Sequence, residues 1–258
     1  MSRFSDAVRL SVGTFSALPV PAPRRVDRET AGVAVTIAPL AVLPVGAGVA
    51  LLAWIGRELG LPTLVIGALA IGFGAFATRG FHLDGLADTS DALASSYDRD
   101  RALAVARTGD IGPAGAVTLL LVLLLQVASA GALACWTWGP LAIGLLWCLA
   151  RVGATIGLRR GLRPAREDGM GATFAGSVPP VALAGVWLVA AAVATWLAVL
   201  TERPALQGLL TVAVALVIVL AFVAHVVRRL GGIIGDLVGA SVEIVLAVLL
   251  VGFAVVAR

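Results

Sequence analysis

The feature that most constrains this chain is a series of apolar runs of about twenty residues each, separated by shorter segments that carry most of the charges. A helix of about 20 apolar residues is long enough to cross the hydrocarbon core of a bilayer. Runs that are continuous rather than alternating indicate helices, which satisfy their backbone polar groups internally in lipid. The mean hydropathy of +1.02 agrees with this interpretation. The sequence therefore predicts an all-α, polytopic membrane helix bundle that forms one integral membrane domain over residues 1–258.

Seven membrane-spanning helices are predicted, and their order defines the connections between them. They cover residues 32–55, 61–78, 113–135, 140–158, 179–200, 205–227 and 237–257. In the N-terminal segment 1–30, Phe4, Val8, Val12 and Phe15 share one helical face, which predicts a helix lying on the membrane surface. The long connections 79–112 and 159–178 hold most of the unusual polar residues, and we expect them to be functional loops.

The distribution of positive charge predicts the orientation. All 19 basic residues are arginines. Fifteen lie in segments 1–31, 79–112, 159–178 and 228–236, and only three lie in the alternate connections and at the C-terminus. Because positive residues remain in the cytoplasm, the N-terminus and both functional loops are expected there and the C-terminus outside. The charge is interpreted as a topology signal, with anionic membrane lipid or phosphorylated substrates as partners and no nucleic acid. The sequence leaves open whether the protein is a homo-oligomer.

Three aspartates follow the second apolar run. Asp84, Asp88 and Asp91 lie in FHLDGLADTSDAL at 81–93, at positions i, i+4 and i+7. On a helix this spacing places all three within an arc of about 60°. Their mutual repulsion would be relieved by Mg²⁺ or Mn²⁺, which prefer oxygen ligands. The alternative is a solvated helix start. We predict a metal-binding face, with His82 as a candidate general base or, alternatively, a packing residue.

A second acidic pair lies near the C-terminus, in RRLGGIIGDLVGASVE at 228–243. Asp236 and Glu243 are seven residues apart and share a helix face. We predict that both contribute to the metal site, and two acidic faces at one membrane boundary suggest a dinuclear site for phosphoryl transfer. The alternative for Glu243 is a salt bridge to Arg151 or Arg229.

Arginines supply candidate phosphate ligands, because their guanidinium groups match phosphate oxygens. The alternative is that they act only as topology signals. The candidates are Arg107, Arg159, Arg160, Arg163, Arg166, Arg228 and Arg229. A further acid, Asp110, lies near Arg107, and the second histidine, His225, lies near the second acidic pair. The chain has no P-loop, no HExxH and no nucleophile elbow, so metal-assisted phosphoryl transfer at a membrane surface is the predicted chemistry.

The motif GFHLDGLADTSDAL at 80–93 resembles the signature of the cobalamin synthase family. The resemblance extends to FSALPVP at 15–21, RTGDIGPAG at 107–115, RPAREDGMGATF at 163–174 and RRLGGIIGDLVGASVE at 228–243. It implies an integral membrane enzyme of bacteria or archaea, here in the bacterial cytoplasmic (inner) membrane. It also implies a requirement for Mg²⁺ and the joining of adenosylcobinamide-GDP to α-ribazole, or to α-ribazole 5′-phosphate, with release of GMP. The family's signature also contains the acidic residues at the positions of Asp84, Asp88, Asp91, Asp236 and Glu243.

Two positions depart from the family pattern. Ile234 replaces a small polar residue, and TGD follows Arg107 where DSR is usual, so the resemblance assigns no role to Asp110. Two rival functions stay open. One is a lipid enzyme similar to the CDP-alcohol phosphotransferases, whose acidic spacing is related. The other is a membrane transporter, in which intramembrane acids also occur.

Overall fold

The computed structural model describes residues 2–166 and 170–255, which fold into helices joined by short connections and two isolated backbone bridges. The other residues, among them Gly169, Arg258 and the end of the seventh predicted span, lie outside the described residues. The helices are α1 (Arg3–Phe15), α2 (Arg28–Thr36), α3 (Ala38–Ala41), α4 (Leu43–Glu58), α5 (Thr63–Phe76), α6 (Phe81–Ser95), α7 (Arg99–Val105), α8 (Pro113–Ala134), α9 (Gly139–Leu149), η1 (Ala150–Val152), α10 (Gly153–Gly157), α11 (Met170–Phe174), α12 (Pro180–Leu200), α13 (Ala205–Leu230) and α14 (Asp236–Ala254).

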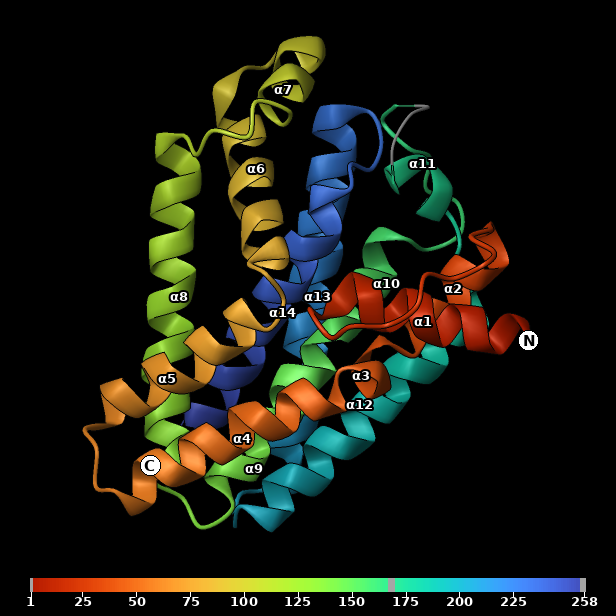
Figure 1. Ribbon diagram of the computed structural model, residues 1–258. Helices are drawn as coiled ribbons and strands as arrows, with labels where there is room; N and C mark the ends of the chain where they lie inside the picture. The colour runs from red at the N-terminus through yellow and green to blue at the C-terminus, as the bar shows by residue number, and fades with distance from the viewer. Residues whose placement is uncertain (1, 167–169, 256–258) are drawn as a thin grey trace.

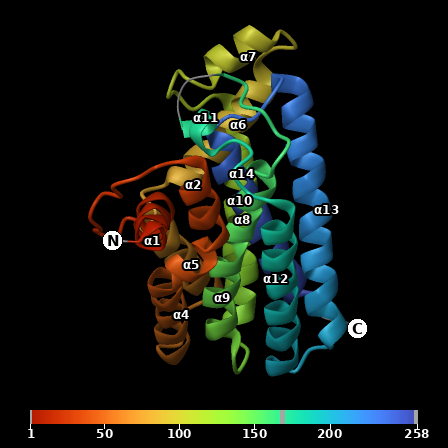
Figure 2. The ribbon, with the colours of Figure 1, turned by 90° about the vertical axis from the view of Figure 1, so that its right-hand side faces the viewer.

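Five helices of the described chain are long and apolar enough to cross a membrane, and they match the last five predicted spans. They are α8, the run α9–η1–α10 over Gly139–Gly157, α12, α13 and α14. In the most apolar window of each, 89% of the Gly139–Gly157 run and 67% of α14 are buried, against about a third or less in α8, α12 and α13. The Gly139–Gly157 run and α14 therefore form the centre of a multi-pass bundle, and α8, α12 and α13 lie around them (Figures 1 and 2).

The two N-terminal spans differ from their prediction. Residues 32–55 form three helices, α2, α3 and α4, because Pro39 and Pro44 fit only into a first helical turn and so divide the run. Helix α5 has only 14 residues, and the chain bends by 89° before it continues as α6. The described chain thus has five helices long and apolar enough to cross a membrane, or up to six if the bent pair is one span. The predicted count of seven is not confirmed, and the orientation of the termini stays a prediction.

The bend between α5 and α6 is built by two consecutive residues with left-handed backbone conformation. Arg79 has φ 56° and Gly80 has φ 68°. Their N–H groups donate to the carbonyls of Phe76 and Ala75, at 2.9 Å each, and close the end of α5. A left-handed conformation at this point is a common way to end a helix. It turns α6 away from the direction of α5 and along the upper part of α8 (Figure 1).

Helix α1 lies across the long helices rather than along them, as the two side views show (Figures 1 and 2). Its predicted apolar face is divided. Phe15 is buried and its ring stacks on His82, with 5.7 Å between the ring centroids, whereas Phe4 is 62% exposed. The N-terminal segment therefore packs against the site-bearing helix α6 at one end. Its predicted place on a membrane surface stays a prediction.

Close helix packing depends on small residues. A Cβ atom at Gly67 in α5 would collide with the carbonyl oxygen of Val127 in α8, and one at Gly131 in α8 would collide with that of Thr63. The two helices therefore cross with their backbones in contact, as small residues allow in membrane bundles. This crossing fixes α8 against α5, and α8 in turn packs along α6 and α14.

Candidate functional site

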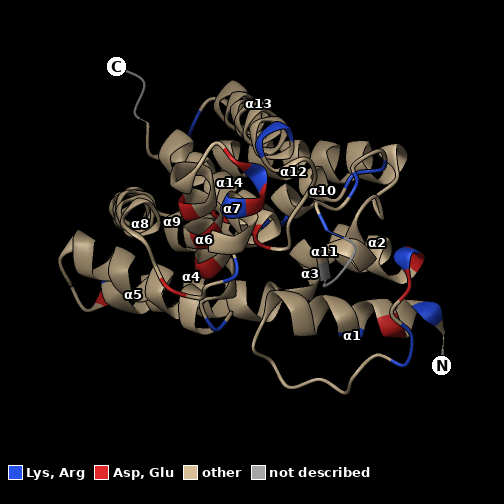
Figure 3. Ribbon diagram, turned by 90° about the horizontal axis from the view of Figure 1, so that it is seen from above, with Lys and Arg blue, Asp and Glu red and all other residues tan. Residues whose placement is uncertain are grey.

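The three aspartates of the 81–93 motif lie on helix α6, as their spacing predicted. Asp84 is exposed, Asp88 is half-buried and Asp91 is only 7% exposed. The carboxylates therefore follow the helix from an accessible end toward a buried one. In the view from above, acidic residues gather where α6 meets α14 (Figure 3).

Asp236 joins this group from the start of α14. The backbones of the two helices touch, since a Cβ atom at Gly85 would lie 2.6 Å from the carbonyl oxygen of Asp236. A Cβ atom at Gly239 would likewise lie 2.9 Å from the backbone of His82. The carboxylate of Asp88 interacts electrostatically with those of Asp84, Asp236 and Asp91. The structure thus brings together two acidic segments separated by about 150 residues of sequence. We call Asp84, Asp88 and Asp236 the acidic cluster.

Asp91 has a structural task that the sequence did not reveal. Its two carboxylate oxygens accept hydrogen bonds from the backbone N–H groups of Gly112, at 2.7 Å, and Gly115, at 2.9 Å. These N–H groups lie at the start of α8 and have no partner within that helix, so a side chain from α6 caps it. A Cβ atom at either glycine would collide with the Asp91 carboxylate. Asp91 therefore fixes α8 beside the acidic cluster.

Replacing Asp91 by alanine is expected to lower the free energy of unfolding by about 1–2 kcal/mol, because two N–H groups of α8 lose their acceptor. Asp91→Asn keeps one acceptor oxygen and should lose less. The measurement is thermal unfolding in detergent, with Asp100→Ala on the exposed face of α7 as the control. Equal stability of Asp91→Ala and the wild type would contradict this role.

Glu243 does not lie with the acidic cluster. It is seven residues beyond Asp236, so it lies about 10 Å further along α14. It is 6% exposed, and one of its carboxylate oxygens accepts a hydrogen bond of 2.8 Å from Nε2 of the buried Gln126. The same nitrogen donates to the Glu243 carbonyl at 3.2 Å. Glu243 therefore belongs to a separate buried polar site.

Arg151 is the positive group of that site. It is 1% exposed, and its guanidinium lies over the Trp147 ring and donates to the Trp147 carbonyl. It interacts electrostatically with Glu243, although the described residues show no direct ion pair between the two. This arrangement is closer to the alternative considered for Glu243, a pairing with Arg151, than to a metal ligand beside Asp236.

His82 is buried inside the protein. It is 1% exposed, it stacks on Phe15, and its ring meets that of Phe81 edge-on. Within the described residues neither ring nitrogen has a hydrogen-bond partner. This environment favours the packing alternative for His82. The prediction that it accepts a proton from a substrate gains no support from its position.

Two of the candidate arginines, Arg229 and Arg159, donate hydrogen bonds to backbone carbonyls. Arg229 donates to the carbonyls of Leu93, at 3.3 Å, and Ser96, at 2.9 Å, and lies over the Tyr97 ring, so it closes the end of α6. Arg159 donates to the Ile156 carbonyl at 2.8 Å, and its partial burial lowers the pKa of its guanidinium. Of the remaining candidates, Arg166 is half-buried and the others are exposed: Arg107, Arg160, Arg163 and Arg228.

Two motif segments that are distant in sequence meet through their backbones. The N–H of Ala165 donates to the carbonyl of Ile233 at 2.8 Å, and the N–H of Ile233 donates to that of Arg163 at 2.9 Å. A Cβ atom at Gly232 would lie 2.5 Å from the nitrogen of Ala165. This contact requires glycine there, and it holds the arginine-rich loop 159–178 beside the start of α14.

A cleft of about 700 Å³ opens beside the acidic cluster. Its residues come from α1, the α5–α6 bend, α6 and the region of α8, and it has both polar and apolar walls. They are Gly13, Thr14, Arg79, Gly80, Phe81, Leu83, Asp84, Ile111 and Leu119. From the sequence alone, Arg79 was interpreted only as a topology signal. Its position five residues before Asp84 is the one signal that placed it near the motif.

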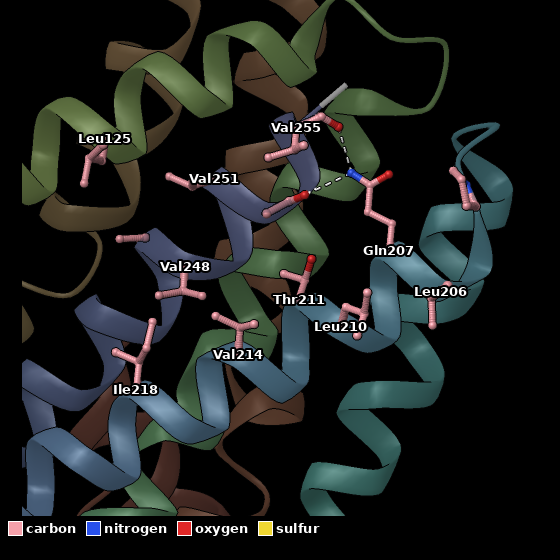
Figure 4. Close-up of a pocket in the computed structure, with 13 residues that line it drawn as sticks. Leu125, Leu206, Gln207, Leu210, Thr211, Val214, Ile218, Val248, Val251 and Val255 are labelled. Atoms are coloured by element: carbon pink, nitrogen blue, oxygen red, sulfur yellow. Dashed lines mark hydrogen bonds between the residues drawn. The ribbon is translucent and has the colours of Figure 1, made fainter. Parts of the chain in front are cut away.

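A second pocket, of about 590 Å³, lies at the opposite end of α14 from Asp236. It is formed by the first turns of α13, the last turns of α14 and Leu125 of α8 (Figure 4). Gln207 donates to the carbonyls of Gly252 and Val255, at 2.9 Å each, and so closes the end of α14. The rest of its lining is almost entirely aliphatic and includes no charged side chain, so it offers nothing for phosphoryl chemistry.

The acidic cluster fits magnesium in its donor atoms. Across residues 2–166 and 170–255, no three His, Cys, Asp or Glu side chains are arranged to hold a metal ion by themselves. Mg²⁺ usually binds through one or two carboxylates, several waters and substrate phosphates rather than in an all-protein cage. Hard oxygen donors that repel one another at the edge of an open cleft match this second mode.

Carboxylates gathered where α6 meets the start of α14, beside an open cleft and a loop rich in arginine, are the arrangement expected of a polytopic membrane enzyme. The chain belongs to the cobalamin-5-phosphate synthase family, whose model matches residues 7–254. A relative from Nocardioides sp., named adenosylcobinamide-GDP ribazoletransferase, is 44% identical over 96% of this chain and 98% of its own. A relative of the same name from Frankia casuarinae is 34% identical over 93% of this chain and 91% of its own. Another from Klebsiella pneumoniae is 35% identical over 89% of this chain and 91% of its own. No solved structure matches the chain.

Proposed function

We propose that this protein transfers the adenosylcobinamide-phosphate group of adenosylcobinamide-GDP to α-ribazole or α-ribazole 5′-phosphate, and that it depends on Mg²⁺. The products would be adenosylcobalamin, or its phosphate, and GMP. The observation that carries the proposal is the acidic cluster beside the 700 Å³ cleft, in a chain of the cobalamin-5-phosphate synthase family. The names of the relatives supply the substrates.

The reaction replaces one phosphate linkage by another. A hydroxyl oxygen of the ribazole attacks the phosphorus that carries cobinamide, the bond from that phosphorus to the GMP oxygen breaks, and the hydroxyl proton is released. Mg²⁺ held by Asp84, Asp88 and Asp236 would neutralise negative charge on the diphosphate and on the departing GMP. Asp84 is the exposed carboxylate that lines the cleft, so it is better placed than the buried His82 to receive the proton.

The protein also has to hold the substrates in line. The accessible arginines of the 159–178 loop are fixed beside the start of α14 by the Ala165–Ile233 contact, and they are suited to bind phosphate oxygens. Asp91 and Arg229 keep α6 in place at its far end. We expect these contacts to orient the acidic cluster and the arginines toward a common region, which would favour in-line attack.

We further propose that the site faces the cytoplasm of a bacterium from its inner membrane. The arginine distribution supports this orientation, because it places the start of α6, the 159–178 loop and the start of α14 on one side. The exposed aliphatic faces of α8, α12 and α13 would then contact membrane lipid.

The experiment supplies purified protein in detergent with adenosylcobinamide-GDP, α-ribazole and Mg²⁺. Equimolar formation of GMP and adenosylcobalamin is expected. A parallel reaction with a CDP-alcohol donor tests the lipid-enzyme alternative, which would release CMP. Release of CMP from that donor with no product from adenosylcobinamide-GDP would overturn the proposal, and so would the absence of turnover with every donor.

A further inference from the structure

Arg79 is held in a backbone conformation that suits glycine rather than arginine. It has φ 56°, and Glu202, with φ 60°, is the only other non-glycine residue of the described chain with a positive φ. Such a conformation is unfavourable for a residue with a side chain, and residues held in it cluster at functional sites. The bend between α5 and α6 needs the left-handed conformation, but it does not need a charged side chain.

The side chain of Arg79 lies at the cleft. Arg79 is exposed, and it lines the same cleft as Asp84. Its Nη2 donates a long hydrogen bond of 3.4 Å to the Gly13 carbonyl of α1. Within the described residues it forms no ion pair with a carboxylate. The guanidinium is therefore a cation at the edge of an acidic site, steadied by one weak contact and able to accept a stronger anionic partner.

The chemistry of the cleft indicates what that partner is. A guanidinium presents paired N–H donors that match phosphate oxygens, and these charge-assisted bonds are stronger than a bond to a neutral carbonyl. Phe81, Leu83, Ile111 and Leu119 form an apolar wall next to it. The cleft thus combines a cation, a carboxylate and an apolar surface, as a bulky phosphate ester requires.

We propose that Arg79 is the phosphate-binding residue of this cleft. It holds the oxygens of a substrate phosphate beside Asp84, while the apolar wall takes the adjoining part of the substrate. This inference rests on the proposed function and adds to it a residue outside the acidic motifs. The phosphate belongs either to the diphosphate of adenosylcobinamide-GDP or to the 5′-phosphate of the acceptor.

The test compares Arg79→Gly with Arg79→Lys, and uses Glu202→Gly as the matched control. Arg79→Gly removes the cation and also the backbone strain, so its thermal stability should equal or exceed that of the wild type. The KM of the substrate that carries the bound phosphate should rise by about tenfold or more, as for loss of a charged hydrogen bond, with a much smaller change in kcat. Arg79→Lys should fall between the two, and Glu202→Gly should behave as the wild type.

Assays with α-ribazole and with α-ribazole 5′-phosphate show which of the two phosphates Arg79 binds. A raised KM for adenosylcobinamide-GDP with unphosphorylated α-ribazole assigns the diphosphate to Arg79. A raised KM found only for α-ribazole 5′-phosphate assigns the acceptor phosphate. Both KM values within twofold of the wild type, with either acceptor, would overturn the inference.

A binding measurement keeps the inference distinct from the proposed function. Pyrophosphate with Mg²⁺ and, separately, inorganic phosphate are titrated into the wild type and Arg79→Gly by calorimetry. If the wild type shows no turnover, the proposed function fails, and these titrations alone decide on Arg79. A Kd about tenfold or more higher in Arg79→Gly for either anion supports phosphate binding. Equal Kd values for both anions, or no binding of either anion by either protein, contradict it.

Discussion

Asp84→Asn and Asp88→Asn are each expected to lower kcat by about a hundredfold to a thousandfold or more while the protein still folds and inserts in the membrane. Each change replaces a charged oxygen donor with a neutral amide of nearly the same shape. The affinity for Mg²⁺ and the neutralisation of the departing GMP depend on that charge. The fold does not, because Asp88 already lies among carboxylates that repel it.

The measurement is GMP release in detergent, together with thermal unfolding of each variant. Removing one charge from the acidic cluster relieves repulsion, so both variants should unfold at or above the wild-type temperature. Asp100→Asn, on the exposed start of α7, is the control and should keep wild-type kcat. A kcat within threefold of the wild type in either cluster variant would remove that residue from the site.

Glu243→Ala is expected to destabilise the protein by about 3 kcal/mol or more, so that little of it accumulates in the membrane. The change leaves the fully buried Arg151 without its counter-charge, and it removes the carboxylate to which Gln126 donates. Removing one of two opposite buried charges is costly even without a direct ion pair, because the remaining charge stays in a medium of low dielectric constant. The loss should therefore appear in stability and accumulation rather than in metal dependence.

The matched variant is the double substitution Arg151→Met with Glu243→Met. Replacing both charges by apolar side chains of similar length should recover most of the stability. Glu243→Gln separates the structural role from the metal-ligand role. We expect it to lose stability while its remaining activity keeps the wild-type dependence on Mg²⁺. A fully stable Glu243→Gln that needs far more Mg²⁺ would instead return Glu243 to the metal site.

The shared face of the three α6 aspartates could be predicted from sequence because it follows from helical spacing. The i, i+4 and i+7 positions of Asp84, Asp88 and Asp91 need only a helix to share a face, and the structure provides one. Spacing does not show which groups that face meets. Asp91 meets the free N–H groups of α8 and becomes a helix cap. Glu243 lies seven residues beyond Asp236 along α14 and accepts a hydrogen bond from Gln126 instead.

Hydropathy located the five long helices but did not locate the breaks near the N-terminus. An apolar run reads alike whether its helix is straight or divided, so residues 32–55 resembled one span. Pro39 and Pro44 were the signal of the division. The role of Arg79 at the cleft was missed for a different reason. The left-handed position at a helix end is usually glycine, so an arginine there has no sequence rule to reveal it.

The Mg²⁺ concentration that gives half-maximal GMP release, in the wild type and in Asp236→Asn, tests the central claim most directly. Asp236 comes from the second acidic segment, so it tests the joining of α6 and α14 in one metal site. We predict no GMP release in excess EDTA, recovery on adding Mg²⁺, and a half-maximal concentration at least about tenfold higher in Asp236→Asn, as the loss of one charged ligand implies. Release of GMP that persists in EDTA, or equal Mg²⁺ dependence in the two proteins, would contradict a magnesium site built from these two helices.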